Sequence, residues 1–257
     1  MLRALVHRLR TGYRTEVYSG KQPQLSDRFR GLPVIKEGAC GDCKACLDAC
    51  PTVAVTMASS EPRRPQIDLG KCTFCGDCQS ACPDDAIRFG AEARLAARAR
   101  DDLIVRAGDW QPRAAMLDQK LRAMFGRSLQ LRQVSAGGCN ACEADINVLS
   151  TIGWDLGSYG IKIVASPRHA DGLLITGPVT ENMRTALAET YAAIPEPKIV
   201  IAVGACAISG GLFAGLPEVH DGVHSLPVDL YVPGCPPHPV TILDGLLAML
   251  GRLKNRI

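Results

Sequence analysis

A duplicated cysteine motif constrains this chain more than any other feature of its sequence. When the sequence is aligned with itself so that Cys40 falls on Cys72, three more cysteines and the proline after them also coincide. The two copies of C-x2-C-x2-C-x3-C-P are Cys40, Cys43, Cys46, Cys50 and Pro51, and Cys72, Cys75, Cys78, Cys82 and Pro83. Each copy predicts a cysteine loop, a helical turn that the proline ends, and a short strand at 54–56 or 86–88. So short a module carries little apolar material, and we expect bound metal to stabilise it.

The motif has the spacing of bacterial two-cluster ferredoxins, in which the fourth cysteine ligates the other cluster. A pair of zinc sites is the alternative, but zinc knuckles do not explain a third cysteine at the same step and a proline, twice. We therefore expect two [4Fe-4S] clusters with crossed ligands. The first set is Cys40, Cys43, Cys46 and Cys82, and the second set is Cys72, Cys75, Cys78 and Cys50.

The C-terminal half predicts a parallel sheet that is covered by helices on both faces. Apolar runs typical of buried strands alternate there with helical patterns, which is the pattern of an α/β domain. The predicted strands are 129–134, 161–165, 173–176, 199–203 and 230–232, and the predicted helices are 141–150, 181–193 and 240–253.

Four further cysteines follow predicted strands of this half: Cys139, Cys142, Cys206 and Cys235. Singly, each would more often be a buried core thiol. Parallel sheets, however, place their ligand sites outside the carboxyl ends of the strands, so the four thiols are expected at one edge. Glycines beside them let the backbone approach a cluster and donate N–H groups to its sulfurs. The chain's twelve cysteines then divide into three sets of four, which predicts a third [4Fe-4S] cluster.

The predicted fold class is α/β, with four segments along the chain. Residues 1–35 form a basic N-terminal segment, 36–90 a two-cluster ferredoxin-like domain, 91–127 a helical linker, and 128–257 a flavodoxin-like parallel-sheet domain with the third cluster. The linker is rich in alanine and arginine, and a helix is expected at 114–124.

The segment 1–36 carries eight lysines and arginines against Glu16 and Asp27, although the net charge of the whole chain is only +3. That net charge is too small to indicate nucleic acid. Leu2, Leu5, Val6 and Leu9 recur at helical spacing between basic residues, as in a short amphipathic helix. Such a helix could lie on a membrane surface, on a partner, or on its own domain.

Nothing in the sequence predicts a membrane span or an export signal. Asp244 interrupts the most apolar stretch, 240–250, which is in any case shorter than the roughly 20 residues that a spanning helix needs. The N-terminus lacks the features of a secretory or twin-arginine signal. We expect a cytoplasmic protein, in which closely spaced thiols stay reduced and favour metal over disulfides.

With these motifs placed, residues 128–257 resemble the small, cluster-bearing subunit of the nickel–iron hydrogenase and respiratory complex I superfamily. The segments that carry the resemblance are GGCNACEADIN, SPRHAD, VGACAISGG and VPGCPPHP. Within that superfamily, the combination of C-x2-C-E with PRHAD most resembles the small subunit of membrane-associated, energy-converting hydrogenases, including the formate hydrogenlyase type. Residues 1 to about 90, with SDRFRGLP before the first motif, are similar to the two-cluster ferredoxin-like subunit of that superfamily. The chain thus looks like a fusion of two subunits that are usually separate.

This resemblance implies that the third cluster faces a nickel–iron site on a separate large subunit. Complex I has two adjacent cysteines where this chain has Asn140 and Ala141 between Cys139 and Cys142, and the departure argues against quinone reduction. No nickel-binding cysteine pairs and no nucleotide fingerprint occur here. We expect no catalytic residue in this chain, which by itself would be an electron carrier.

Five polar residues near the cysteine motifs have two interpretations each. Glu143 and Asp145 begin a predicted helix, where the helix dipole alone favours acids, or they tune the cluster or carry protons toward the large subunit. Arg168 and His169 match a family motif that faces the cluster, or they are a solvated loop pair. His238 could ligate metal, but four cysteines already complete the cluster, so it is expected to be a loop residue.

Three functions follow from these patterns. The first is an electron-transfer subunit of a membrane-associated multi-subunit hydrogenase, peripheral on the inner face of the cell membrane. Its expected partners are a nickel–iron large subunit, integral membrane subunits and an electron donor of the ferredoxin, formate or carbon monoxide dehydrogenase type. The second is a complex I-like subunit that reduces quinone or a sulfur compound through a large subunit without nickel. The third is a stand-alone ferredoxin-type carrier or redox sensor. The first two predict an apolar docking face at the C-terminal cysteine edge, and the third predicts a polar one.

Overall fold

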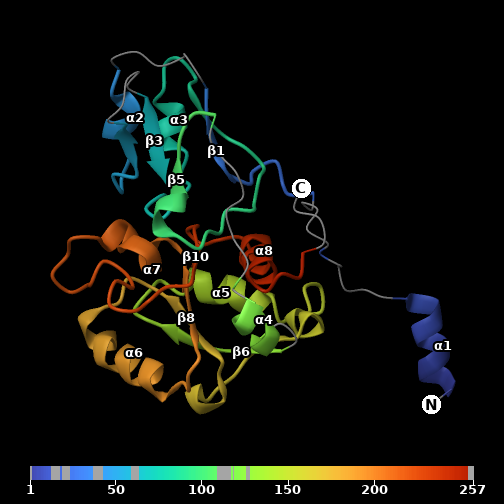
Figure 1. Cartoon of the computed structure of the whole chain (residues 1–257). Coiled ribbons are helices and arrows are strands. Elements are labelled where there is room, and N and C mark those ends of the chain that lie inside the picture. The colour runs from blue at the N-terminus through green and yellow to red at the C-terminus, as the bar shows by residue number, and fades with distance from the viewer. Residues whose placement is uncertain are drawn as a thin grey trace.

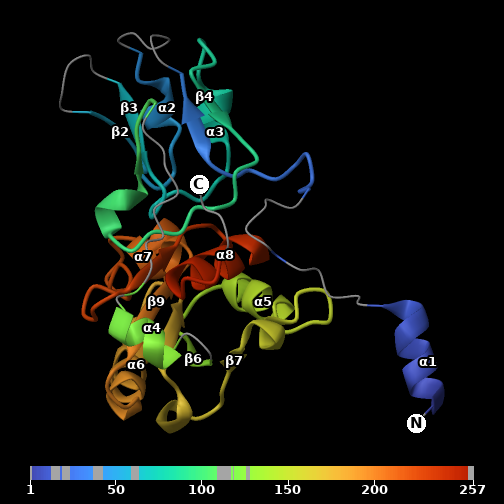
Figure 2. The ribbon, with the colours of Figure 1, turned by 45° about the vertical axis from the view of Figure 1, so that its right-hand side comes forward.

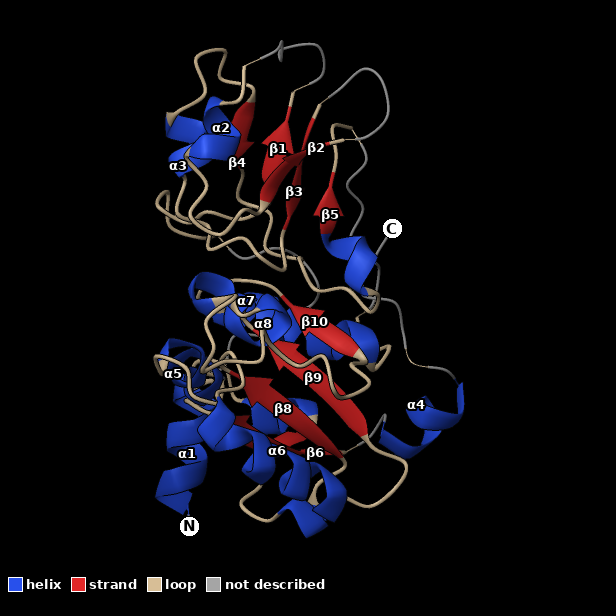
Figure 3. Ribbon diagram, turned by 90° about the vertical axis from the view of Figure 1, so that its left-hand side faces the viewer, coloured by secondary structure: helices blue, strands red, loops and turns tan. Residues whose placement is uncertain are grey.

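The C-terminal part of the chain folds around a five-stranded parallel sheet. We describe it from a computed structural model, which covers residues 2–12, 18, 24–36, 43–58, 64–108, 117, 119–125 and 128–253. The strands are β6 (Leu129–Ser135), β7 (Ile161–Ile163), β8 (Gly172–Thr176), β9 (Ile199–Val203) and β10 (Leu230–Val232), in the order β10-β9-β8-β6-β7. All neighbours are parallel, and the order is that of flavodoxin-like sheets. The predicted α/β fold class is confirmed, and Figure 3 shows the strands as one twisted layer.

Helices cover both faces of this sheet because its strands are apolar on both sides. In β8, Leu173 and Ile175 face one buried cluster, which includes Leu187 of α6 (Glu181–Ala193). Leu174 faces the other cluster, which is formed largely by α8 (Pro239–Met249) and includes Ile146 of α5 (Ala141–Val148). A sheet buried on both faces is what the continuous apolar runs in the sequence predicted.

The two cysteine repeats fold as a pseudo-symmetric pair of units, which we call the ferredoxin-like domain (residues 33–89). Its elements are β1 (Pro33–Ile35), α2 (Ala45–Asp48), β2 (Val55–Met57), β3 (Pro65–Asp68), α3 (Asp77–Ser80) and β4 (Ile87–Phe89). The self-alignment of the sequence carries α2 onto α3 and β2 onto β4. It also pairs Val53 with Asp85, which share a left-handed backbone at φ 51° and 50°.

The strands of the two repeats are interleaved. β1 pairs antiparallel with β4, and β2 pairs antiparallel with β3, so each two-stranded pair takes one strand from each side of the duplication. β5 (Ile104–Val105) adds to the free edge of β3. The fourth cysteine of the first repeat, Cys50, lies beside the second repeat.

The linker differs from the prediction, because residues 93–99 are extended and not helical. Backbone groups of Ala97 exchange hydrogen bonds with Tyr231 of β10, the edge strand of the sheet, at 3.0 Å and 2.8 Å. Pairing with an open strand edge satisfies the backbone of Ala97, and Ala93, Ala96 and Ala97 are buried, which overrides their helix propensity. A 3-10 turn follows at Arg100–Leu103, and α4 spans Gln119–Phe125. The start of the helix expected at 114–124 lies outside the described residues.

A continuous buried core joins the ferredoxin-like domain to the sheet domain. Ile67 and Leu69 share a cluster with Ile208 of α7 (Ala205–Ser209), at the end of β9. The Ser209 hydroxyl donates to the carbonyl of Gly70 at 2.9 Å, although the two residues lie far apart in the sequence. Figure 1 shows the first domain seated over α7, α8 and β10.

The N-terminal helix α1 (Leu2–Thr11) is formed as predicted, but it contributes no buried residue. Figures 1 and 2 both show it away from the two domains. Within the described residues, no helix combines the length and the apolar character needed to cross a membrane.

Candidate iron–sulfur sites

Four cysteine thiols gather at the carboxyl edge of the sheet. Cys139 and Cys142 lie at the turn from β6 into α5, Cys206 lies on α7 after β9, and Cys235 follows β10. The pKa of Cys206 is raised to about 11, mainly by burial and then by negative charge on Cys235 and Cys139. Burial also raises the pKa of Cys142, followed by the charges of Cys206, its neighbour Glu143, Cys235 and Cys139. The thiols are therefore close enough to repel one another when ionised.

Two glycines allow close contacts at this edge, near the point where the strand order reverses. A Cβ at Gly177, which follows β8, would lie 2.6 Å from the backbone nitrogen of Gly138, which follows β6. These strands flank the reversal point, where open parallel sheets bind ligands. At Gly204, whose φ is +91°, a Cβ would lie 2.6 Å from the Cys142 Sγ atom. The glycines that the sequence places beside the cysteines thus let two loops and a thiol approach closely.

A second group of thiols combines both repeats of the ferredoxin-like domain. Cys50, Cys72, Cys75 and Cys78 line one small cavity. The pKa of Cys72 is raised to about 12 and that of Cys78 to about 11, mainly by burial, and negative charge on Cys50 and Cys75 contributes in both cases. The fourth cysteine of the first repeat is therefore grouped with the first three of the second.

The first group is only partly visible, because Cys40 lies outside the described residues. The other members predicted for this group are Cys43, Cys46 and Cys82. The backbone N–H of Ala86 donates to the Cys82 sulfur at 3.2 Å, and the N–H of Ala54 donates to the Cys50 sulfur at the same distance. The two repeats therefore orient their fourth cysteines in the same way.

These thiol groups suit iron–sulfur clusters. Bringing several thiolates into a buried site costs free energy, as the raised pKa values of Cys72, Cys78 and Cys206 show, and bound iron would offset that cost. Among the described residues, no three His, Cys, Asp or Glu side chains are placed to hold a single metal ion. The assignment of each cysteine to a cluster stays a prediction.

The second and third thiol groups are neighbours across the domain junction. Burial raises the pKa of Cys235, and charge on Cys139 and then on Cys75 raises it further. Cys75 belongs to the ferredoxin-like domain and Cys235 to the sheet domain. The paired side chains of Asp68 and Arg100 brace this junction, with nitrogen–oxygen distances of 2.8 Å and 2.6 Å.

The predicted polar residues occupy three different environments. Glu143 is buried, and the Thr176 hydroxyl at the end of β8 donates to its carboxylate. Arg168 and His169, in contrast, lie on a 3-10 turn before β8, where both side chains are exposed. They precede the amino end of β8, whereas the cysteines follow the carboxyl ends of their strands. Because β7 is short, the chain turns back early to start β8, and the structure does not place this pair with the thiols.

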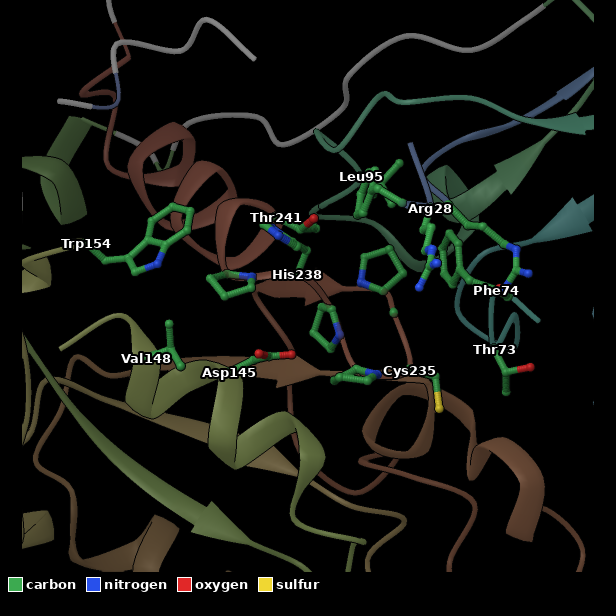
Figure 4. A pocket seen from close by; sticks show the side chains of 17 residues that line it. Arg28, Thr73, Phe74, Leu95, Asp145, Val148, Trp154, Cys235, His238 and Thr241 are labelled. Atoms are coloured by element: carbon green, nitrogen blue, oxygen red, sulfur yellow. The ribbon is translucent and has the colours of Figure 1, made fainter. Parts of the chain in front are cut away.

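Asp145 and His238 line a cavity of about 540 Å³ between the two domains. The His238 Nδ1 atom accepts a hydrogen bond from the Val240 N–H at 3.2 Å and so caps α8, a role beyond that of a loop residue. Burial lowers the pKa of His238 and raises that of Asp145, while their mutual attraction opposes both shifts. Figure 4 shows Trp154 on one side of this pair and Arg28 on the other.

Two family models match the two parts of the chain. The model described as "NADH ubiquinone oxidoreductase, 20 Kd subunit" matches residues 139–249, and a "4Fe-4S dicluster domain" model matches residues 39–86. The "Probable membrane-bound hydrogenase subunit mbhJ" of Pyrococcus furiosus is 42% identical over 139 residues, which cover 54% of this chain and 83% of that protein. The chain belongs to this NADH ubiquinone oxidoreductase subunit family.

Other proteins of the oxidoreductase subunit family are also similar. "Formate hydrogenlyase subunit 7" of Escherichia coli K12 is 43% identical over 144 residues, which is 56% of this chain and 56% of that protein. The chain thus spans little more than half the length of this relative. An NADH-quinone oxidoreductase subunit of Citrifermentans bemidjiense is 42% identical over 118 residues, covering 46% of this chain and 69% of that protein. The relatives are named as subunits of oxidoreductase complexes, and the resemblance predicted from the cysteine segments is confirmed.

Sequence reasoning missed several residues of the site in this oxidoreductase subunit. Thr176 gave no signal, because a threonine that ends a buried strand is ordinary. Phe29 and Trp154 flank His238, with ring centroids 5.3 Å and 6.2 Å away. Phe29 lies in the SDRFRGLP segment, whose similarity to the ferredoxin-like subunit was a usable signal, but only the fold shows that this segment packs against VPGCPPHP.

Proposed function

We propose that this chain is the iron–sulfur electron-transfer subunit of a membrane-associated, multi-subunit nickel–iron hydrogenase of the formate hydrogenlyase type. One observation carries the proposal: the thiols at the carboxyl edge of the sheet adjoin those of the ferredoxin-like domain through Cys235 and Cys75. A carrier that served a separate substrate site of its own would not need three neighbouring thiol groups, arranged one after another, for passing electrons. When bound, [4Fe-4S] clusters take up and release single electrons.

The proposed ligand sets keep the crossed arrangement. Cys40, Cys43, Cys46 and Cys82 would hold the first cluster; Cys72, Cys75, Cys78 and Cys50 the second; and Cys139, Cys142, Cys206 and Cys235 the third. The grouping of Cys50 with the second repeat supports the crossover. We expect the protein to set the potentials through burial of the thiols and through N–H donors, such as those that Ala54 and Ala86 direct at sulfur.

The contacts at the junction between the domains support an order for the three proposed sites. Ser209, on the same short helix as Cys206, donates to the carbonyl of Gly70, which lies just before Cys72. Asp68 accepts from the N–H of Gly70 at 2.9 Å and pairs with Arg100. These contacts would hold the second proposed site beside the third, with the first proposed site farthest from the sheet.

An apolar surface next to the third site supports a catalytic partner. Leu212, Phe213 and Leu216 expose 58%, 40% and 49% of their surface, and they follow Gly211, whose Cβ position is 3.0 Å from the Cys206 Sγ atom. Exposed apolar side chains grouped beside a redox site are typical of a docking face. We assign this face to the large subunit that carries the nickel–iron site, with integral membrane subunits and an electron-donor module completing the assembly.

The proposed location is peripheral, on the inner face of the cell membrane. The names of two relatives support it, since this chain matches 83% of a probable membrane-bound hydrogenase subunit and is 43% identical to formate hydrogenlyase subunit 7 in the matched part. Integral partner subunits would hold the complex at the membrane.

A complex I-like function is the second candidate. The 42% identity to an NADH-quinone oxidoreductase subunit favours it, and the two residues between Cys139 and Cys142 argue for the hydrogenase. The large subunit separates the two candidates, because only the hydrogenase needs both of its cysteine pairs as nickel ligands.

The test uses the assembled complex, purified without oxygen. We expect about 12 iron and 12 acid-labile sulfide per copy of this chain, and nickel in the large subunit. Cys206→Ser should abolish H2 production with the physiological donor while the two ferredoxin-like clusters remain reducible. Near-stoichiometric zinc, or H2 production that persists without the third cluster, would overturn the wiring. A large subunit without nickel would instead promote the complex I-like candidate.

A further inference from the structure

Helix α1 exposes an apolar stripe that nothing in the described chain covers. Leu2, Leu5 and Leu9 expose 79%, 62% and 77% of their surface, and Val6 between them exposes 39%. Gly12, at φ +61°, ends the helix and donates its N–H to the carbonyl of Arg8 at 3.0 Å, so the stripe is limited to this one short helix. An ordinary surface helix would bury these side chains on its own domain.

The rest of the helix is basic. Arg3, His7, Arg8 and Arg10 lie between the apolar residues, and the sequence of α1 contains no acidic residue. Because the helix contributes positive charge only, its polar face is suited to a surface that is itself negative. An apolar stripe next to side chains that carry only positive charge is typical of helices that lie in a lipid interface.

The attachment of α1 to the body allows the helix to reach such a surface. Tyr18 is buried where its hydroxyl donates to Asp244 of α8 at 2.8 Å and its N–H donates to the Tyr159 hydroxyl at 2.8 Å. The chain is therefore anchored shortly after Gly12, and α1 itself lies apart from both domains in Figures 1 and 2. Of the three settings that the sequence allows for this helix, packing on its own domain is thus not the one that the structure shows.

We propose that α1 binds the surface of an anionic bilayer, with its axis parallel to the membrane and its leucines among the acyl chains. Ten residues rise only about 15 Å, half of a hydrocarbon core, so the helix lies on the membrane and does not span it. A helix this short is marginal in water, and lipid contact stabilises it. The inference deepens the proposed membrane location and rests on that proposal only for the presence of a bilayer near the complex.

The experiment measures binding of the purified, cluster-loaded full chain to vesicles by co-sedimentation. We expect binding to vesicles of phosphatidylglycerol and phosphatidylcholine, weak binding to pure phosphatidylcholine, and loss of binding as salt is raised. Leu9→Glu should weaken the partition coefficient about ten-fold or more, since one buried leucine alone accounts for about that factor. Arg3→Gln should weaken it about five-fold.

Ile152→Glu is the matched control. Ile152 exposes 79% of its surface, as Leu2 does and nearly as Leu9 does, and it lies after α5 on the sheet domain. The same change of side chain and charge there should leave vesicle binding unaltered. All variants should keep the iron content of the wild-type chain, which shows that they fold.

Three outcomes would overturn the lipid assignment: a wild-type chain that does not sediment with anionic vesicles, equal binding by Leu9→Glu and wild type, or equal weakening by Ile152→Glu. If Leu9→Glu instead leaves vesicle binding unchanged but releases the chain from the assembled complex, α1 docks on a partner protein. The vesicle results do not depend on the iron content or on H2 production by the wild-type complex, so a failure here is distinguishable from a failure of the proposed function.

Discussion

Gly204 gives a test of the third site that removes no cysteine. In Gly204→Ala, the new Cβ would lie 2.6 Å from the Cys142 Sγ atom, about 0.8 Å short of the 3.4 Å at which ordinary contact begins. The sulfur would have to move several times farther than the roughly 0.2 Å that a metal–ligand distance tolerates. The left-handed backbone at φ +91° adds about 1–2 kcal/mol of strain for any residue with a Cβ.

Gly215→Ala separates the two effects. Gly215 has a φ of +81°, and its Cβ would meet nothing within 4 Å. Both variants should therefore lower the free energy of unfolding by about 1–2 kcal/mol in denaturant titrations, but only Gly204→Ala should lose about four of the chain's roughly 12 irons. Full iron content in Gly204→Ala, or equal iron loss in both variants, would refute the placement of a cluster against Cys142.

Two further changes test the ferredoxin-like domain and its junction. Cys50→Ser should remove the cluster proposed for Cys72, Cys75 and Cys78. Adding Cys72→Ser to it should then cost no more iron, while adding Cys43→Ser should raise the loss to about eight irons. Iron analysis and EPR measure these losses, and the reverse pattern would contradict the crossover. Arg100→Ala removes two charged hydrogen bonds to Asp68, whose side chain is only 15% exposed, and should lower the free energy of unfolding by about 2 kcal/mol. Arg184→Ala breaks the exposed pair with Glu181 and should change the free energy of unfolding by less than about 0.5 kcal/mol. Equal effects of the two arginine changes on this free energy would show that the pair of Asp68 and Arg100 adds no stability.

Patterns that depend on local burial were predictable from the sequence. The bounds predicted for β9, β10 and α6 agree with the structure at both ends, because turn residues border their buried faces. The edge on which Cys139, Cys206 and Cys235 lie follows from the parallel strand order alone.

Features that depend on distant partners were not predictable. The segment 93–99 has the composition of a helix, but its backbone finds a strand edge in a distant part of the sequence, at Tyr231. Arg168 and His169 were expected beside the cluster, and the shortness of β7, which the sequence does not reveal, puts them before β8. The contact of His238 with Phe29 likewise joins segments that no local pattern connects.

The interleaved strands of the ferredoxin-like domain have a consequence for biosynthesis. β1 is made early, but its only partner among the described strands is β4, and residues 87–89 must be synthesised before that pair exists. Until then, the first repeat carries its thiols on a segment whose strands are not yet paired. At the typical synthesis rate, this state lasts for several seconds. With the crossed ligand sets that we propose, cluster insertion would have to follow translation of the second repeat, and a chain truncated between the two repeats would expose its cysteines and complete neither site.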